Sequence, residues 1–366
     1  MSWHQSRLGD VMKLQRGHDL PGDLRKDGEV PVVSSSGITG HHNEAKATAP
    51  GVVTGRYGTI GEVFYIEQDY WPLNTALYVT DFKGNHPRFV AYFLRNILRN
   101  YKSEKAAVPG VNRNVLHEIK VCYPDTYIQD RIASILSVYD DLIENNRRRI
   151  QLLEQTARLL YKEWFVHLRF PGHEHVKIKD GVPEGWEKKP LGDLLTLQRG
   201  FDLPTSQRKD GPFPIYASTG INGYHVEAKV KGPGVVTGRS GSLGTVMFVS
   251  GDFWPLNTSL WIKDFKLVGP YFATHLLESM QLEQYNGGAA VPTLNRNDVH
   301  RVEVLCPTPT LLLLFEDYDK DAVQQIDLLK KMIAKLANAR DLLLPRLMNG
   351  EITVYPVHNF VLWSNP

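Results

Sequence analysis

Apolar residues follow two different spacings along this chain. Residues 1–125 and 184–308 contain short runs of β-branched and aromatic residues, such as Val63–Ile66, separated by glycine and proline, which predicts strands joined by turns. From Ile128, and again from Phe315, apolar residues recur at steps of three and four for about five heptads, which is typical of coiled-coil helices. We therefore expect two strand-rich domains and two long helices, each roughly 35 residues or ~50 Å long.

Each strand-rich domain also contains a shorter helical pattern, at Pro87–Arg99 and at residues 271–280. Charged residues flank the seams of the long helices, which favours a protruding pair of helices; two helices buried in one globular core are the alternative. The predicted seams consist of Ile132, Ile135, Tyr139, Leu142, Asn146, Ile150, Leu153, Ala157, Leu160 and Trp164 in the first helix, and of Phe315, Tyr318, Ala322, Ile326, Leu329, Ile333, Leu336, Arg340, Leu343 and Leu347 in the second.

The chain contains one long internal repeat. Residues 8–83 match residues 191–266 without a gap at about 43 of 76 positions. The match includes Pro-Gly-Val-Val-Thr-Gly-Arg at 50–56 and 233–239, and Trp-Pro-Leu-Asn-Thr at 71–75 and 254–258. This period far exceeds the roughly 20–50 residues of a solenoid repeat, so the chain contains a duplicated domain. Cys122 and Cys306 occupy nearly equivalent places in separate copies, which predicts two buried strand residues and no disulfide.

Composition is that of an ordinary globular protein. Of 366 residues, 42% are hydrophobic and 22% are charged, and no apolar run approaches the roughly 18 residues of a membrane span. The first residues lack the apolar core of a signal peptide, and two cysteines indicate a reducing compartment, so we expect a cytoplasmic protein. Because the net charge is only +2, any DNA-binding surface must be a local concentration of positive charge.

Three motifs in the helical segments resemble a known family. Ile-Ala-Ser-Ile-Leu-Ser at 132–137, Asp-Asp-Leu-Ile-Glu-Asn-Asn-Arg-Arg-Arg-Ile at 140–150, and Asp-Leu-Leu-Leu-Pro-Arg-Leu-Met-Asn-Gly-Glu-Ile at 341–352 resemble the central helices of type I restriction–modification specificity subunits. The resemblance implies a mixed α/β fold: two similar strand-rich α/β target-recognition domains separated by two long antiparallel coiled-coil helices, with pseudo-twofold symmetry. It divides the chain into a first target-recognition domain (1–125), a first central helix (126–168), a linker (169–183), a second target-recognition domain (184–308), a second helix (309–352) and a tail (353–366).

The same resemblance implies partners and a division of chemistry. Double-stranded DNA is the ligand, two modification subunits with S-adenosylmethionine and adenine-methylating activity pack on the helices, and restriction subunits use ATP and Mg²⁺. This chain would then be a non-catalytic specificity subunit with no cofactor, no metal and no membrane contact. The sequence has no P-loop, no Asn-Pro-Pro-aromatic methyltransferase loop and no metal-binding histidine motif.

Two similar domains related by an approximate twofold axis match the symmetry of a DNA duplex, so each domain can read one half-site at a spacing that the helices set. We expect a bipartite target with an unread spacer. Because the domains are so alike, we also expect half-sites that are identical or nearly so. A coiled-coil scaffold whose domains bind proteins, without DNA specificity, is the alternative.

Basic residues shared by both copies are candidates for DNA contact, because arginine and lysine bind phosphates and guanine. Polar positions that differ between the copies are candidates for differences in base preference. The alternatives are maintenance of the domain for the shared residues and neutral surface change for the others. The predicted DNA-binding residues are Arg16, Arg25, Lys26, His41, His42, Lys46, Arg56, Tyr57, Arg113, Arg199, Arg208, Lys209, Tyr224, His225, Lys229, Arg239, Ser240 and Arg296.

The long helices supply the candidate surface for protein partners. Arg147 and the two arginines that follow it could instead contact the DNA backbone across the spacer, or form a solvated charged face. The predicted partner-binding residues are Ile132, Ile143, Arg147, Ile150, Leu153, Leu160, Ile326, Ile333, Leu336 and Leu343.

Overall fold

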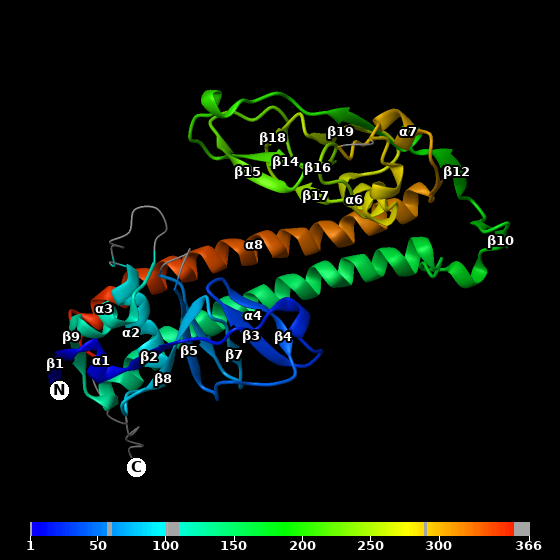
Figure 1. The fold of residues 1–366 in the computed structure, drawn as a ribbon. Helices are drawn as coiled ribbons and strands as arrows, with labels where there is room; N and C mark the ends of the chain where they lie inside the picture. Colours follow the sequence, from blue (N-terminus) through cyan, green and yellow to red (C-terminus); the bar gives the residue numbers. More distant parts are fainter. Residues whose placement is uncertain (1, 57–60, 100, 102–109, 289–290, 355–366) are drawn as a thin grey trace, which may run out of the picture. The chain divides into compact units, whose positions relative to one another are not determined.

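The computed structural model describes residues 2–56, 61–99, 101, 110–288 and 291–354 (Figure 1). The chain forms two compact units, which we call unit 1 (Met1–Asn145 with Met332–Pro366) and unit 2 (Asn146–Lys331). Each unit holds one copy of the repeat. Each also holds part of both long helices, because helix α4 (Thr126–Tyr161) continues from unit 1 into unit 2 and helix α8 (Pro309–Met348) continues from unit 2 into unit 1.

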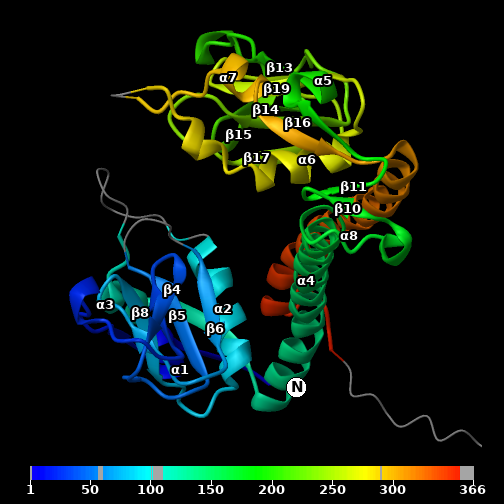
Figure 2. The ribbon, with the colours of Figure 1, turned by 90° about the vertical axis from the view of Figure 1, so that its right-hand side faces the viewer.

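Unit 1 alternates short strands and helices ahead of α4. A four-stranded antiparallel sheet has the order β2-β8-β5-β6, a three-stranded sheet has the order β4-β3-β7 with β3 and β7 parallel, and β1 pairs with β9. Helix α2 packs on β5 and β6, where Figure 2 shows it between these strands and α4. The elements are β1 (Trp3–Arg7), α1 (Leu8–Val11), β2 (Lys13–Arg16), β3 (Val30–Ser34), β4 (Gly37–His42), β5 (Gly51–Gly55), β6 (Val63–Ile66), β7 (Trp71–Pro72), β8 (Ala76–Asp81), α2 (Pro87–Arg99), α3 (Arg113–Glu118) and β9 (Lys120–Pro124), with a 3-10 turn at Gly22–Leu24.

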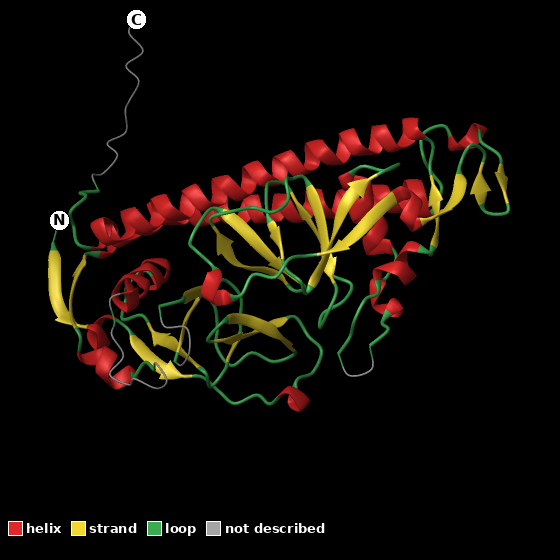
Figure 3. Ribbon diagram, turned by 90° about the horizontal axis from the view of Figure 1, so that it is seen from above, coloured by secondary structure: helices red, strands yellow, loops and turns green. Residues whose placement is uncertain are grey.

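Unit 2 repeats this topology, which confirms the two strand-rich α/β domains expected from the repeat (Figure 3). The sheets β13-β19-β16-β17, β15-β14-β18 and β12-β20 correspond to those of unit 1, strand for strand. The segment between α4 and β12 contains the hairpin β10–β11. The elements are β10 (Ile178–Lys179), β11 (Val182–Pro183), β12 (Glu187–Pro190), α5 (Leu191–Leu194), β13 (Leu195–Arg199), β14 (Phe213–Ala217), β15 (Gly220–His225), β16 (Gly234–Gly238), β17 (Val246–Val249), β18 (Trp254–Pro255), β19 (Ser259–Phe265), α6 (Pro270–Ser279), α7 (Arg296–His300) and β20 (Glu303–Cys306), with a π-helical turn at Lys162–Val166 and 3-10 turns at His173–His175, Thr205–Gln207 and Leu282–Tyr285.

In unit 1, polar contacts hold α2 against the long helices. The Tyr92 hydroxyl donates a hydrogen bond to Asp140 Oδ2 in α4 (2.5 Å), and Arg340 of α8 pairs with Oδ1 of the same carboxylate (2.5 Å). Burial, together with the Asp140 carboxylate, raises the pKa of Tyr92. Leu136 of α4 and Leu344 of α8 lie in the same core as the domain. The recognition domain and both helix segments of unit 1 therefore share one hydrophobic core.

In unit 2, aromatic side chains join the strand-rich domain to the long helices. Phe165 lies 4.9 Å from Phe272 of α6 and 5.2 Å from Phe315 of α8, measured between ring centroids, in edge-to-face arrangements. The Glu316 carboxylate accepts the backbone N–H of Phe272 (2.7 Å) near the start of α6. His275 of α6 pairs with Asp319 of α8 at 3.0 Å, so one buried ion pair also joins the domain to the helix.

The predicted seam of the first helix is partly wrong. Ile135 and Leu142 are exposed, whereas Leu136 and Ile143, one position further along, are buried. The pair at 135 and 142 and the pair at 136 and 143 are both apolar and equally spaced, so periodicity alone could not decide which pair is buried. In the second helix Tyr318 is exposed, and the other apolar seam residues are buried or half-buried.

The two cysteines differ in exposure. Cys306 is buried in β20, as predicted, but Cys122 is exposed in β9, so the prediction of two buried thiols is wrong for Cys122. Burial raises the pKa of the Cys306 thiol. Within the described part of the chain, no helix is both long enough and apolar enough to cross a membrane.

Candidate nucleic-acid interface

Three strand ends meet at one edge of the four-stranded sheet of unit 1. β2 and β5 both pair antiparallel with β8, so they run in the same direction and end beside the start of β8. Arg16 ends β2, and Arg56 directly follows β5. Arg16 Nε donates to the carbonyl oxygen of Asn74 (3.4 Å), and the backbone N–H of Arg56 donates to that of Thr75 (2.9 Å). Two arginines therefore flank the turn that leads into β8.

A third arginine reaches this edge from helix α3. The backbone N–H of Val111 donates to the carbonyl oxygen of Arg56 (2.8 Å), Asn112 caps the helix, and Arg113 is its first residue. Arg16 and Arg113 are exposed, and Arg56 is half-buried. We call Arg16, Arg56 and Arg113 the arginine edge of unit 1. Three arginine residues whose backbones meet at one edge suit contacts to phosphate oxygens.

Unit 2 has the equivalent arginine edge, formed by Arg199, Arg239 and Arg296. Arg239 Nη1 donates to the carbonyl oxygen of Asn257 (3.5 Å), and Arg296 is the first residue of α7. Arg199 differs from Arg16 in that it lies 3.8 Å from the Asp202 carboxylate. Ser240, another predicted DNA-binding residue, follows Arg239 directly and is half-buried. The fold thus gathers three of the shared arginines at one edge in each unit.

Arg25 and Arg208 each bind an edge strand of their own domain. Arg25 Nη1 donates to the carbonyl oxygen of Thr39 in β4 (3.2 Å). Arg208 Nη1 donates to the carbonyl oxygen (2.7 Å) and to Oδ1 (2.9 Å) of Asn222 in β15. Both guanidinium groups hold an edge strand in place, which favours the structural alternative for this pair over direct DNA contact.

His42 and His225 also have a structural role, because they are 4% and 6% exposed. Each Nδ1 accepts a backbone N–H, from Lys26 (3.0 Å) and Lys209 (3.1 Å) respectively. Burial argues against DNA contact by these two histidines, whereas the side chains of both lysines are exposed.

Lys46 and Lys229 lie over the indole rings of Trp71 and Trp254, at 5.0 and 4.9 Å from the ring centroids. These cation–π contacts leave both lysines on the surface. His41 in β4 and its counterpart Tyr224 in β15 are exposed as well, on the edge strands of the three-stranded sheets. Tyr57 lies outside the described residues.

A pair of histidines beyond the best-matched block escaped the sequence analysis. His117 Nε2 accepts the backbone N–H of Leu14 (3.0 Å), and His300 Nε2 accepts that of Leu197 (2.8 Å). Burial lowers the pKa of both imidazoles, and the charges of Arg113 and Arg296 add to this. An Nε2 that accepts an N–H carries no proton, and through this hydrogen bond the two histidines tie α3 and α7 to the strands that end at the arginine edges. Their identical spacing in the two copies was the signal available in the sequence.

The predicted partner-binding residues of the helices lie mainly inside the units. Ile132, Ile143, Ile150 and Ile326 are buried, and Arg147 is exposed. Half-buried are Leu153, Leu160, Ile333, Leu336 and Leu343. Other apolar residues of the helices are exposed instead. They are Ile135, Val138 and Leu142 of α4 and Leu342 of α8 in unit 1, and Leu152 and Leu159 of α4 and Leu314 and Leu328 of α8 in unit 2.

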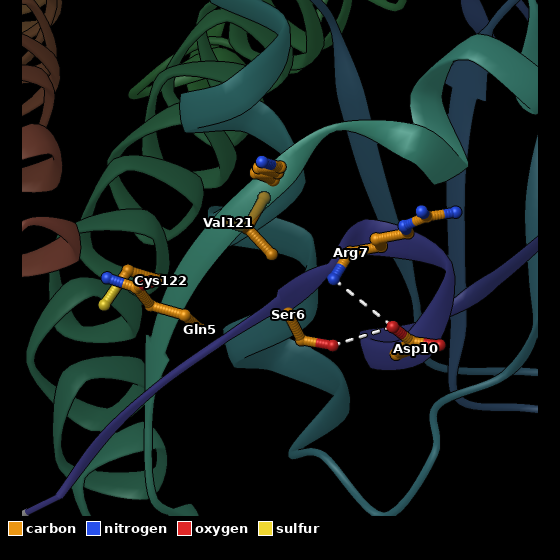
Figure 4. Close-up of a pocket in the computed structure, with 7 residues that line it drawn as sticks. Gln5, Ser6, Arg7, Asp10, Val121 and Cys122 are labelled. Carbon is orange, nitrogen blue, oxygen red and sulfur yellow. Dashed lines mark hydrogen bonds between the residues drawn. The ribbon is translucent and has the colours of Figure 1, made fainter.

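A hollow of about 560 Å³ lies beside the β1–β9 pair in unit 1 (Figure 4). Its acidic residue, Asp10, accepts hydrogen bonds from Ser6 Oγ (2.8 Å) and from the backbone N–H of Arg7 (3.2 Å), which lower the pKa of Asp10. Arg7 pairs with Glu118 at 2.6 Å. These polar groups cap α1 and join its start to α3, so they are already paired with one another. Among the described residues, no cluster of three or more histidine, cysteine or acidic side chains could hold a metal ion.

Comparison with known proteins identifies the family. The family model described as the type I restriction modification DNA specificity domain matches residues 1–155 and 183–310, which include both copies of the repeat. The chain belongs to this family. It is 27% identical over 275 residues to the type I restriction enzyme MjaIX specificity subunit of Methanocaldococcus jannaschii, a match that covers 67% of this chain and 63% of that protein. It is 22% identical over 340 residues to the HindI specificity subunit of Haemophilus influenzae, covering 69% of this chain and 73% of that one.

A solved structure supports the fold of this specificity-family chain. The S subunit of a type I restriction–modification system from M. genitalium superposes with a TM-score of 0.61 and 17% sequence identity, and the match covers 95% of this chain and 96% of that one. The fold expected from the motifs, mixed α/β with two strand-rich domains and long helices, is therefore confirmed.

Proposed function

We propose that this chain is the DNA-sequence-recognition subunit of a type I restriction–modification complex. It binds DNA through its two strand-rich domains and carries no catalytic site of its own. The observation that supports this most directly is the match of both repeat copies to the DNA specificity domain, together with an arginine edge on each copy. The edges supply the local positive charge that a chain of net charge +2 needs for binding phosphates.

The target of this subunit is bipartite, with one half-site for each domain and an unread spacer between them. The two domains are identical at about 43 of 76 aligned positions, including most of the basic residues proposed to contact DNA, so the half-sites are the same or nearly the same. The methylated motif can be read by single-molecule sequencing of DNA from cells that contain the complete system. Two unrelated half-sites would refute the near-palindrome.

The exposed apolar residues of α4 and α8 in each unit form the surfaces on which the two modification subunits pack. This revises the set of residues inferred from the sequence, because most of those apolar residues already pack within the units. S-adenosylmethionine belongs to the modification subunits, and ATP and Mg²⁺ belong to the restriction subunits. The complex works in the cytoplasm, where its DNA is.

The test of DNA recognition uses the full chain assembled with the methyltransferase that accompanies it. Fluorescence anisotropy should show tight binding to a duplex with the methylated motif, and an excess of unrelated duplex should not displace the complex. Equal displacement by both duplexes would favour a scaffold without DNA specificity and would overturn the proposal.

The length of α4 sets the spacer. Insertion of four residues beside Gln151 lengthens this helix by ~6 Å, comparable to one or two base-pair steps of about 3.4 Å. The expected result is a changed spacer with unchanged half-sites in the methylated motif. Altered half-sites at constant spacing would contradict the role of the helix as a ruler.

A further inference from the structure

The edge strand of the three-stranded sheet carries an exposed isoleucine in both units. Ile38 in β4 and Ile221 in β15 are 56% and 53% exposed and occupy equivalent positions of the repeat. Among the strands that the structure describes, each pairs with its hairpin partner alone, β3 or β14, and lies at the edge of its sheet. An exposed β-branched residue on an edge strand is a site for unwanted strand pairing, and here it is accessible to a ligand at the same place in both copies.

Each hairpin lies close to the arginine edge of its own unit. In unit 1, Ile38 pairs with Val33 across the hairpin, and the Val33 carbonyl oxygen accepts the backbone N–H of Leu73 (2.8 Å). The next residue, Asn74, is the one whose carbonyl oxygen Arg16 binds. In unit 2, Ile221 pairs with Tyr216, which accepts the N–H of Leu256 in the same way (2.8 Å). The strand that bears the isoleucine is separated by two strand spacings of about 4.8 Å from β7 in unit 1 and from β18 in unit 2. It therefore lies roughly 10 Å from the turn that the arginines flank.

Each edge strand contains a glycine with positive φ beside an arginine side chain. Gly40 and Gly223 have φ values of +142° and +110°, and a Cβ at these positions would lie 3.2 Å from Arg25 Nη1 and 3.6 Å from Arg208 Nη1. The positive φ favours glycine at both positions, and at Gly40 a Cβ would also crowd Arg25, whereas at Gly223 it would only touch Arg208. Both arginines bind carbonyl oxygens of the strand. Arg25 and Arg208 are positioning residues for the strand that bears the isoleucine.

We propose that the β3–β4 and β14–β15 hairpins enter the DNA major groove and that Ile38 and Ile221 each contact a thymine methyl group at the same position of their half-sites. This inference rests on the proposed function. A major groove about 12 Å wide admits a two-stranded β-ribbon, and apolar side chains read the thymine methyl there. Arginines roughly 10 Å from the ribbon then reach the phosphates that border the groove. The neighbouring pairs Thr39/Asn222 and His41/Tyr224 differ and set any difference between half-sites.

The test replaces thymine by deoxyuridine, which lacks only the methyl group, at one position of the methylated motif at a time. The full chain, assembled with its methyltransferase, should bind about fourfold more weakly when the contacted methyl is lost in either half-site. Ile38→Ala should abolish this sensitivity in one half-site and Ile221→Ala in the other, while Ile38→Val keeps part of it. Ile178→Ala is the matched control, because Ile178 is 54% exposed in β10, outside both hairpins.

Three outcomes separate the possibilities. A wild-type complex that binds its motif specifically but tolerates every deoxyuridine overturns the isoleucine contact and leaves the proposed function intact. Isoleucine variants that fold like wild type and retain the full deoxyuridine effect also overturn it. A wild-type complex without any sequence preference overturns the proposed function itself.

Discussion

His275 gives unit 2 a stability that depends on pH. This residue of α6 is 8% exposed, its Nε2 lies 3.0 Å from Asp319 Oδ2 in α8, and its Nδ1 lies 3.3 Å from Glu278 Oε2. Burial disfavours the charged imidazole, but Asp319 and Glu278 outweigh it and raise the pKa of His275 to about 9. The charged ion pair therefore stabilises the contact between the second recognition domain and α8.

The size of this effect follows from the shift. A pKa raised from 6.5 to about 9 corresponds to on the order of 3 kcal/mol of stability. That contribution is complete below pH 6.5, falls by at most about 1.4 kcal/mol per pH unit above it, and is lost above about pH 9. His275→Gln removes the titratable imidazole and should therefore remove this part of the pH dependence of stability.

Hydrogen exchange of peptides from α6 and from the first half of α8 measures the effect within unit 2. Wild type and His275→Gln are compared at each pH from 6 to 9.5, so that the effects of titrating groups present in both proteins cancel. The protection lost in the variant should be largest at pH 6 and should vanish near pH 9.5. His175→Gln is the control, because the His175 side chain is 85% exposed. A difference between wild type and His275→Gln that stays constant over the whole range would refute the assignment.

Three further predictions concern the arginine edge, a close backbone contact and the helix surface. Arg16→Ala should weaken binding to all sequences alike and lower the slope of log K against log salt by about 1, measured by anisotropy; a loss confined to one base pair would contradict a phosphate contact. Gly17→Ala should destabilise unit 1 by about 1–3 kcal/mol in urea unfolding, because its Cβ would lie 2.2 Å from the carbonyl oxygen of Leu73; Gly22→Ala, with open space around it, should not. Leu152→Glu should keep stability within about 0.5 kcal/mol but prevent co-elution with the methyltransferase, whereas Ile150→Ala should cost on the order of 2 kcal/mol and still co-elute.

The sequence predicted the architecture well because its strongest signals are long. A repeat of 76 aligned positions and heptads sustained along two helices are independent of any single contact. The embedded helices were found for the same reason, and α2 and α6 begin and end within one residue of the expected bounds. Individual exposures were harder to predict. Ile135 and Leu136 are both apolar neighbours on α4, and only packing against the domain decides which one is buried.

The candidate site shows the same division. The sequence by itself determined that basic residues recur in both copies, since identity at a fixed spacing is visible without a structure. Only the tertiary structure sorted them, because strand pairing brings Arg16 and Arg56 to one edge, the start of α3 adds Arg113 there, and His42 is buried. Side chains that are alike in type and in repetition thus differ in role, since burial and hydrogen-bond partners depend on residues far apart in the chain.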